Sequence, residues 1–347
     1  MISSSKKKFI VEYRPASIRV ARVSALTAPV TIEAIEEISL DNGTNAIADS
    51  VRKISGAKSN GYLNGCCIVY PERRVVRQVS IDAPKGKETE FIFSVLHDEI
   101  ENAPPELSAH CLSPETGQEI NPSDFGRKEV IICGVPNPDI EKIQKGMLEH
   151  AVYPKRIELG TVGLIGALQN ALAWKQSKLP ALLIEIDERS TNAVIVGANG
   201  VEMSRKVLTG TLDIAEALKE ELNLKDDDAA ERLLSSKDFD FSSISRKILR
   251  KLLRELQSSI GYYEVQTGQS VSWIHSHSKG ISMDWLELSL GQALNLKPFE
   301  LDFHAWLESL EIRFADEELA SKVDISWMAM MSALCSFGVQ KESEEAA

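Results

Sequence analysis

The stretch "IEIDERSTNAVIV" (residues 184–196) decides how the fold of this chain is interpreted. Two apolar runs flank a short acidic and polar segment, a pattern that is typical of two strands joined by a turn. The segment carries Glu185, Asp187, Ser190 and Thr191, whose side-chain oxygens can face a ligand. This turn is therefore the first candidate for a functional site.

An earlier segment, "VEYRPASIRVARV" (residues 11–23), repeats the pattern. Glu12 aligns with Glu185 and Ser17 aligns with Ser190, at an offset of 173 residues, which is about half of the chain. Two copies of one hairpin, each opening one half of the sequence, predict a duplicated α/β fold.

Hydrophobic periodicity predicts a similar order of elements in both halves. We expect strands at 8–13, 17–24, 29–36, 65–70, 74–81, 128–136, 156–160, 201–207 and 271–275, in addition to the second hairpin. We expect helices at 44–57, 87–103, 138–151, 161–176, 211–222, 226–235 and 244–267. The proline-rich segment 104–124 is expected to hold a long loop, and the apolar run 325–339 predicts a buried terminal helix.

Composition excludes several classes of function. The chain has 347 residues, of which 43% are hydrophobic, enough for two domains with sizeable cores. Its net charge of −12 argues against general binding of nucleic acid or of anionic lipid. The run 325–339 is too short to span a bilayer, which takes about 20 residues. With no signal-peptide pattern and five cysteines in no CxxC pair, we expect a soluble cytoplasmic protein with reduced thiols.

Taken in order, several segments resemble the PilM family of type IV pilus assembly proteins, relatives of the division protein FtsA in the actin-like superfamily. Residues 75–106 match the family's strand, linker and helix ending at proline, and residues 129–168 match its strand–helix–strand–helix segment. "IEIDERST" stands where the family has "VDIGASTT", and "SRKILRKLLRELQSSIGYYEVQTG" (245–268) is similar to its long helix. The resemblance spans about residues 9–302, and the order of the segments carries it.

The resemblance implies an α/β fold of two actin-like (ribonuclease H-like) lobes around a cleft. The first lobe is expected at 1–180, with an inserted subdomain at about 82–150. The second lobe is expected at 181–347, with a helical subdomain at about 209–267.

It also implies that the two hairpin turns face a nucleotide. In the superfamily each turn has an aspartate that helps to hold Mg²⁺ and a glycine that lets backbone N–H groups approach the phosphates. Here Glu12 and Glu185 replace the aspartates, while Arg14 and Asp187 replace the glycines. Ser17, Ser190 and Thr191 keep hydroxyl groups that can contact a phosphate.

The third nucleotide-binding turn also departs from the family pattern. The family's "LSGGGA" loop corresponds to "HSHSKG" (275–280), which keeps Ser276 and Gly280 but replaces the glycine run by His277, Ser278 and Lys279. We therefore expect no cofactor, with ATP and Mg²⁺ bound only if this degenerate cleft is still competent. His275 and His277 have no nearby cysteine, and no metal site is expected.

The resemblance implies a non-catalytic scaffold at the cytoplasmic face of a type IV pilus or type II secretion-like machine. Its partners would be the short cytoplasmic N-terminal tail of a PilN-like inner-membrane protein and other pilus assembly proteins, and it would reach the membrane through them. The alternative is an active actin-like ATPase, a sugar kinase or a filament-forming FtsA-like protein. An intact phosphate turn, which those activities need, is not found.

Two further features have two interpretations each. Arg14 and Asp187 lie at equivalent turns, so they either bridge the two lobes or stay separately hydrated or locally paired. The basic positions of the helix at 244–267, namely Lys247, Arg250, Lys251 and Arg254, form either a solvated face or a docking surface for an acidic partner.

Overall fold

The structure is a computed structural model that describes residues 8–56, 60–121, 129–278 and 280–334. Its first lobe is built on a six-stranded sheet with the order β14-β3-β2-β1-β4-β8. β1 (Lys8–Tyr13), β2 (Ser17–Val23) and β3 (Val30–Ser39) are antiparallel neighbours, whereas β4 (Leu63–Val69) and β8 (Val152–Leu159) run parallel to β1. Helices α1 (Thr44–Ser55) and α3 (Asn137–Glu149) cover one face of this sheet.

The second lobe repeats this sheet. Its order is β11-β10-β9-β12-β13, which matches β3-β2-β1-β4-β8 strand for strand. The strands are β9 (Ala181–Ile186), β10 (Thr191–Gly197), β11 (Gly200–Val207), β12 (Trp273–Ser278) and β13 (Lys297–Pro298). Glu12 pairs with Arg19 in the first hairpin and Glu185 pairs with Asn192 in the second, so the offset of 173 residues holds in the register. The topology therefore confirms the predicted duplication.

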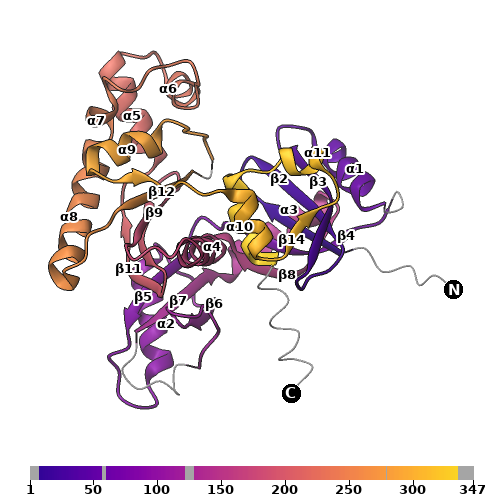
Figure 1. Ribbon diagram of the computed structural model, residues 1–347, viewed down its shortest axis with the longest axis horizontal. Helices are drawn as coiled ribbons and strands as arrows, with labels where there is room; N and C mark the ends of the chain where they lie inside the picture. The colour runs from indigo at the N-terminus through magenta and orange to yellow at the C-terminus, as the bar shows by residue number, and fades with distance from the viewer. Residues whose placement is uncertain (1–7, 57–59, 122–128, 279, 335–347) are drawn as a thin grey trace.

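β9 is buried on both faces, which explains why it reads as a continuous apolar run. Leu182 and Ile184 face a core formed with the helical subdomain, namely α5 (Thr211–Leu222), α6 (Asp227–Leu234), α7 (Ser245–Ile248), α8 (Arg250–Thr267), and with α9 (Leu286–Leu294). Ala181 and Leu183 face a core shared with α4 (Gly160–Trp174), which lies between the two large sheets (Figure 1).

A small antiparallel sheet forms the inserted subdomain, with the order β5-β7-β6. Its strands are β5 (Val75–Ser80), β6 (Leu107–Leu112) and β7 (Glu129–Pro136), and α2 (Glu88–Glu99) covers it. The sheet thus occupies 75–136, whereas the sequence indicated 82–150, because α3 packs on the first-lobe core instead. β6 lies where the sequence indicated a long loop.

The inserted subdomain also contacts the second lobe. The backbone N–H of Gln78 donates to Ser204 Oγ at 2.7 Å, and the N–H of Val201 donates to the Pro114 carbonyl oxygen at 3.0 Å. Gly200 has a φ of +131°, and a Cβ there would lie 2.2 Å from the same Pro114 oxygen. Glycine is therefore required where the two parts meet.

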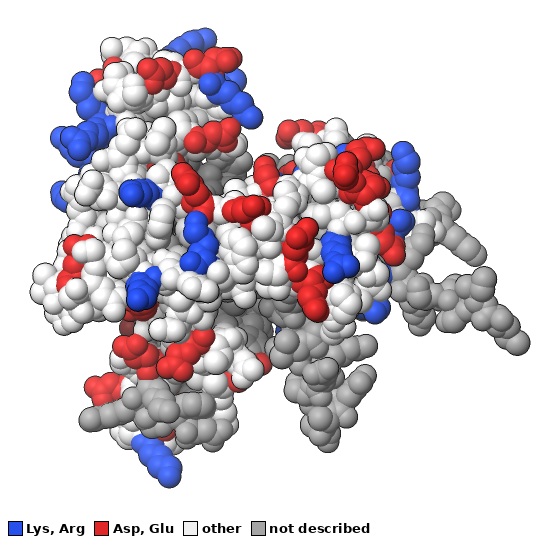
Figure 2. Space-filling model, viewed as in Figure 1, with Lys and Arg blue, Asp and Glu red and all other residues white. Residues whose placement is uncertain are grey.

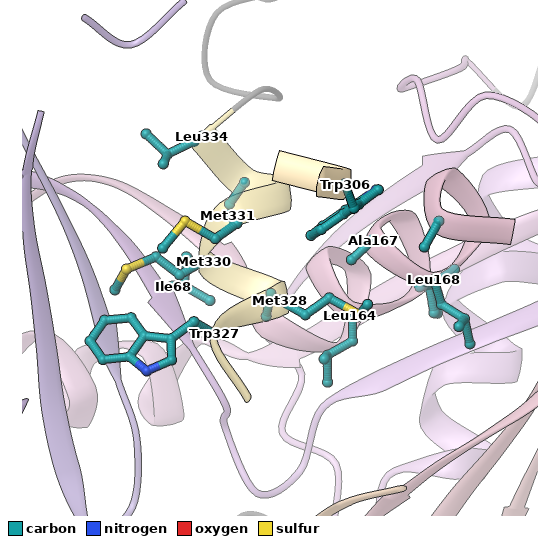
Figure 3. Close-up of a cluster of buried hydrophobic side chains, with 14 of the residues drawn as sticks. Ile68, Leu164, Ala167, Leu168, Trp306, Trp327, Met328, Met330, Met331 and Leu334 are labelled. Atoms are coloured by element: carbon teal, nitrogen blue, oxygen red, sulfur yellow. The ribbon is translucent and has the colours of Figure 1, made fainter. Parts of the chain in front are cut away.

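The C-terminal segment returns to the first lobe. It comprises α10 (Phe303–Ser309), β14 (Ile312–Phe314), α11 (Glu317–Ser321), a 3₁₀ turn (Ile325–Trp327) and a helical stretch at 328–334. β14 pairs with β3, and the stretch at 328–334 packs with α4 and Trp306 in the core that joins the lobes (Figure 3). The sequence placed this segment in the second lobe, and residues 335–339 of the predicted terminal helix lie outside the described residues. Among the described residues, no helix is both long and apolar enough to cross a membrane.

Candidate functional site

Each of the two hairpins contributes a buried glutamate to the candidate site. Glu12 near the end of β1 and Glu185 near the end of β9 are both buried, at 0% and 1% exposure. Burial of two carboxylates requires compensating partners for each of them. Those partners differ between the two halves, and they define the candidate site.

Arg74, which the sequence analysis did not single out, lies at the centre of the site. It follows β4 in the first lobe, and its side chain is 1% exposed. Its Nη2 atom lies 3.0 Å from Glu185 Oε2 and 2.8 Å from Asp187 Oδ2, both in the second lobe. Its Nε donates to Thr161 Oγ1 at 2.7 Å, and its Nη1 donates to the Pro71 carbonyl oxygen. One guanidinium group therefore joins the two lobes and the start of α4.

Glu185 and Asp187 both pair with Arg74. Thr161 Oγ1 donates to Glu185 at 2.7 Å, and Asn192 Nδ2 donates to it at 3.3 Å. Burial raises the pKa of Asp187 to about 7, although the neighbouring Arg74 acts to lower it. A proton on Asp187 relieves the imbalance of two carboxylates around one guanidinium group.

Tyr70 fills the space beside Arg74. Its hydroxyl donates to Glu12 Oε1 at 2.5 Å, and its ring stacks on His277 of the second lobe with centroids 5.9 Å apart. A Cβ on Gly160 would lie 2.1 Å from the Tyr70 ring, so glycine at the start of α4 makes room for it. Burial raises the pKa of Tyr70 well above its ordinary value, with a further contribution from Glu12.

Glu12 receives its cation from its own lobe. Arg19 Nη1 lies 3.6 Å from Glu12 Oε2, and Arg19 Nη1 also donates to the Ser326 carbonyl oxygen at 2.7 Å. The Arg19 guanidinium group stacks over Trp327, 4.4 Å from the ring centroid. Burial raises the pKa of Glu12, against the influence of Arg19 and the Tyr70 hydrogen bond. The C-terminal segment is thereby tied to the first hairpin.

The polar turn residues make contacts inside their own lobes. The N–H of Arg14 donates to the Ser17 carbonyl oxygen at 2.9 Å, and the N–H of Asp187 donates to the Ser190 carbonyl oxygen at 2.8 Å. Ser17 Oγ donates to Glu37, and Thr191 Oγ1 donates to the Thr209 carbonyl oxygen. These amides and hydroxyls are not available to a phosphate in this arrangement.

Of the two interpretations of Arg14 and Asp187, the direct ion pair between them does not form. Among the ion pairs of the described residues, Arg14 lies 3.9 Å from Glu37 and Asp187 pairs with Arg74. The bridge between the lobes exists, but Arg74 provides it. The insertion of Arg74 satisfies Asp187, while Glu37 on β3 holds Arg14 on the first lobe.

The acidic side chain of Glu287 contacts the third turn, residues 275–280. Glu287 Oε2 accepts a hydrogen bond from the Ser276 backbone N–H at 2.7 Å and lies 3.2 Å from His275 Nδ1. Gly280 has open space where a Cβ would lie, so no contact requires glycine there. Lys279 is outside the described residues.

The histidines are not arranged as metal ligands. His277 is buried, and burial lowers its pKa well below the ordinary value, with Arg14 adding to this effect. Its Nε2 atom and Glu12 Oε2 have no hydrogen-bond partner among the described residues. In that part of the chain, no group of three or more His, Cys, Asp or Glu side chains is placed to hold a metal.

Some of the predicted site residues come together in the structure. The structure brings together Glu12, Glu185 and Asp187 with the partners that we missed, namely Tyr70, Arg74, Thr161 and Arg19. The internal repeat could have identified Arg19, because it is the cross-strand partner of Glu12 at the position equivalent to Asn192. Arg74 has no such signal, since it lies beside an identical Arg73 and is 111 residues from Glu185.

Comparison with solved structures identifies the architecture. A chain of the PilM–PilN type IV pilus biogenesis complex is similar over 95% of this chain and 98% of its own length, with a TM-score of 0.66 and 16% identity. A Bacteroides thetaiotaomicron protein of actin-like ATPase fold and unknown function is similar over 96% of this chain and 99% of its own, with a TM-score of 0.45 and 8% identity. The archaeal actin homologue Ta0583 covers the same shares, with a TM-score of 0.43 and 9% identity.

No family model and no curated protein matches the sequence. Of these three structures, the chain of the PilM–PilN complex is the one used in the argument. At 16% identity, its similarity is evidence for the fold. Together with the repeated strand order, it shows that this chain has a duplicated, two-lobed actin-like fold of the PilM type.

Proposed function

We propose that this protein is a non-catalytic, PilM-like scaffold of a type IV pilus or type II secretion-like assembly. The observation that carries the proposal is Arg74, which pairs with Glu185 and Asp187 at the second of the two hairpin turns to which the family resemblance assigns nucleotide phosphates. Its ion pairs with Glu185 and Asp187 are internal substitutes for a ligand that would otherwise join the lobes.

The free-energy cost of displacing Arg74 is expected to oppose nucleotide binding. Removing one partner of a buried ion pair costs about 3–5 kcal/mol, because it leaves an uncompensated buried charge. An incoming phosphate would also meet the carboxylates of Glu185 and Asp187 and turn amides that already donate within their hairpins. We therefore infer that ATP binding is weak or lost, and that Mg²⁺ has no resident site in the cleft.

The proposed partner is the short cytoplasmic tail of a PilN-like inner-membrane protein. The similar solved structure contains PilN by name, and a scaffold of this shape would reach the membrane through such a partner. We propose that the tail binds between the first lobe and the inserted subdomain, within 66–96 and 129–150. An extended tail would be held there by exposed backbone groups and apolar pockets.

A binding titration separates a scaffold from an ATPase. A synthetic peptide with the sequence of the PilN-like tail encoded in the same genome is titrated against the full chain by fluorescence anisotropy. We expect binding without nucleotide, and a change of less than about twofold on adding about 1 mM Mg-ATP, because a compound that does not bind cannot shift the equilibrium. Tail binding that requires Mg-ATP would favour the active ATPase, and no tail binding under either condition would reject the partner.

A further inference from the structure

The outer face of α8 is exposed along its whole length and lies on the side of the helical subdomain away from the first lobe (Figure 1). Arg250 and Arg254 lie on it one turn apart, and Arg246 in α7 precedes them by the same spacing. Further along the same face come Gly261, Tyr262 and Val265, and the last two are 63% and 82% exposed. Basic side chains gather on the part of the helical subdomain that holds α7 and α8 (Figure 2).

The arginines are not explained by the stability of the helix. The first turn of α8 contains Arg250 and Lys251 and no acidic residue, although the positive end of a helix dipole favours acidic side chains there. Lys251 has a local partner in Asp213. Among the ion pairs of the described residues, none involves Arg246 or Arg250, and Arg254 pairs only with the neighbouring Glu255.

Gly261 is a second unfavourable choice on the same face. A Cβ at Gly261 would meet nothing within 4 Å, so no contact among the described residues requires glycine. Glycine in a helix interior costs about 1 kcal/mol relative to alanine, and the adjacent Tyr262 and Val265 leave apolar area in water. A small residue on an exposed helix face permits close approach of a second helix.

We propose that this face of α8, defined by Arg246, Arg250, Arg254, Gly261, Tyr262 and Val265, docks an acidic amphipathic helix of another protein. Acidic residues spaced three or four apart in that helix would pair with the three arginines. Its apolar end would cover Tyr262 and Val265. Because Gly261 has no side chain, the partner helix would approach α8 closely at that position. Residues that weaken a helix without making a compensating contact inside the protein are expected at functional surfaces.

Charge decides between the possible occupants. A partner that complements three arginines must be acidic, and acidic groups placed in the register of a helix match their spacing of four residues. None of the hydrogen-bond or ion-pair partners of Arg74 among the described residues lies in α7 or α8, so this inference stands apart from the proposed function.

Photo-crosslinking of the full chain in its native cells tests the proposal. p-Benzoylphenylalanine replaces Tyr262 in one strain and, as a matched exposed apolar control, Leu288 in another, which is 54% exposed. The crosslinked segment is identified by mass spectrometry. We expect a major adduct at position 262, absent at 288, with a helix-forming segment that carries acidic residues three or four apart.

A charge reversal completes the test. Arg250→Glu with Arg254→Glu should lower the yield of that adduct at least about tenfold, as expected for loss of close charge pairs. Lys225→Glu with Arg232→Glu, which changes the same charge elsewhere in the helical subdomain, should leave it unchanged. The α8 variant should melt within a few degrees of the parent, because Arg250→Glu suits the first turn of the helix and the Arg254–Glu255 pair that is lost is exposed. Equal adducts at 262 and 288, an adduct with lipid or with a second copy, or an adduct insensitive to the α8 charges would overturn the proposal.

Discussion

The two hairpins of this protein carry the same buried glutamate but compensate it in different ways. Glu12 is matched by Arg19, its cross-strand neighbour in the same hairpin. At the equivalent position the second hairpin has Asn192, which is neutral, and the cation beside Glu185 comes from Arg74 in the other lobe. Charge is therefore balanced within the first lobe but across the lobes at the second turn.

This difference locates the contact that holds the lobes together. Arg19 connects β2 to the C-terminal segment through Ser326 and Trp327, so it stabilises one lobe. Arg74 connects the first lobe to β9 and α4, so it stabilises the arrangement of both lobes. The four predictions that follow test this difference, beginning with the largest expected effect and ending with the smallest.

Removing Arg74 should have the largest effect. Arg74→Ala removes the buried cation that pairs with Glu185 and Asp187, and we expect the free energy of unfolding to fall by about 3–5 kcal/mol. Hydrogen exchange should accelerate at residues 70–74 and in the second hairpin together. The variant Arg74→Met with Glu185→Gln and Asp187→Asn should recover most of the loss, because it removes the charges as a set. A single substitution that costs less than about 1 kcal/mol would show that the lobes do not depend on this contact.

Arg19→Ala should cost less, about 1–3 kcal/mol, the range for leaving a buried polar group without its partner. Glu12 keeps the Tyr70 hydrogen bond, and the raised pKa of Glu12 means that the carboxyl group can take up a proton. Faster exchange should be confined to the first hairpin and residues 324–334. Equal acceleration in the second hairpin would contradict the separation of the two clusters.

The third effect is a dependence on pH. Burial raises the pKa of Asp187 to about 7, whereas the unperturbed value is 3.8. The folded state therefore holds a proton that the unfolded chain has already released, and the stability from this proton is lost as pH rises from about 4 to about 7. Relative to Asp187→Asn, the parent should become less stable over that window when unfolding is measured in denaturant. A constant difference between the two proteins would mean that Asp187 is ionised throughout.

Asn192→Ala should have the smallest effect, about 0.5–1.5 kcal/mol, because it removes one neutral donor to Glu185. Thr161 and Arg74 continue to satisfy that carboxylate. Denaturant unfolding of Asn192→Ala beside Arg19→Ala compares equivalent positions in the two hairpins directly. A larger loss of stability for Asn192→Ala than for Arg19→Ala would mean that Asn192 is the more important partner of its glutamate.

Local patterns predicted most of the strands and helices and the duplication, because apolar alternation and the Glu-to-Ser spacing are local. β6 was missed because the prolines before it resemble loop punctuation, while its stability comes from pairing with β7. The return of the C-terminal segment to the first lobe was missed for another reason. Apolar composition around Trp327 and Met331 predicts burial but not which sheet buries it.

The candidate site was predicted in part for the same reason. Both glutamates follow from the repeat, since equivalent strands place equivalent residues at the cleft. Arg73 and Arg74 are chemically identical neighbours, and only the fold turns one toward Asp139 at the surface and the other into the cleft. Their roles depend on contacts across the lobes that no local pattern encodes.

Calorimetric titration of the full chain with Mg-ATP tests most directly whether Arg74 has taken the place of a nucleotide. We expect no binding tighter than about 100 μM, equivalent to roughly 5.5 kcal/mol, for the parent protein. Arg14→Gly with Asp187→Gly should bind more tightly, because it clears both turns and frees Arg74 from one carboxylate. A low-micromolar dissociation constant for the unaltered chain would contradict the account.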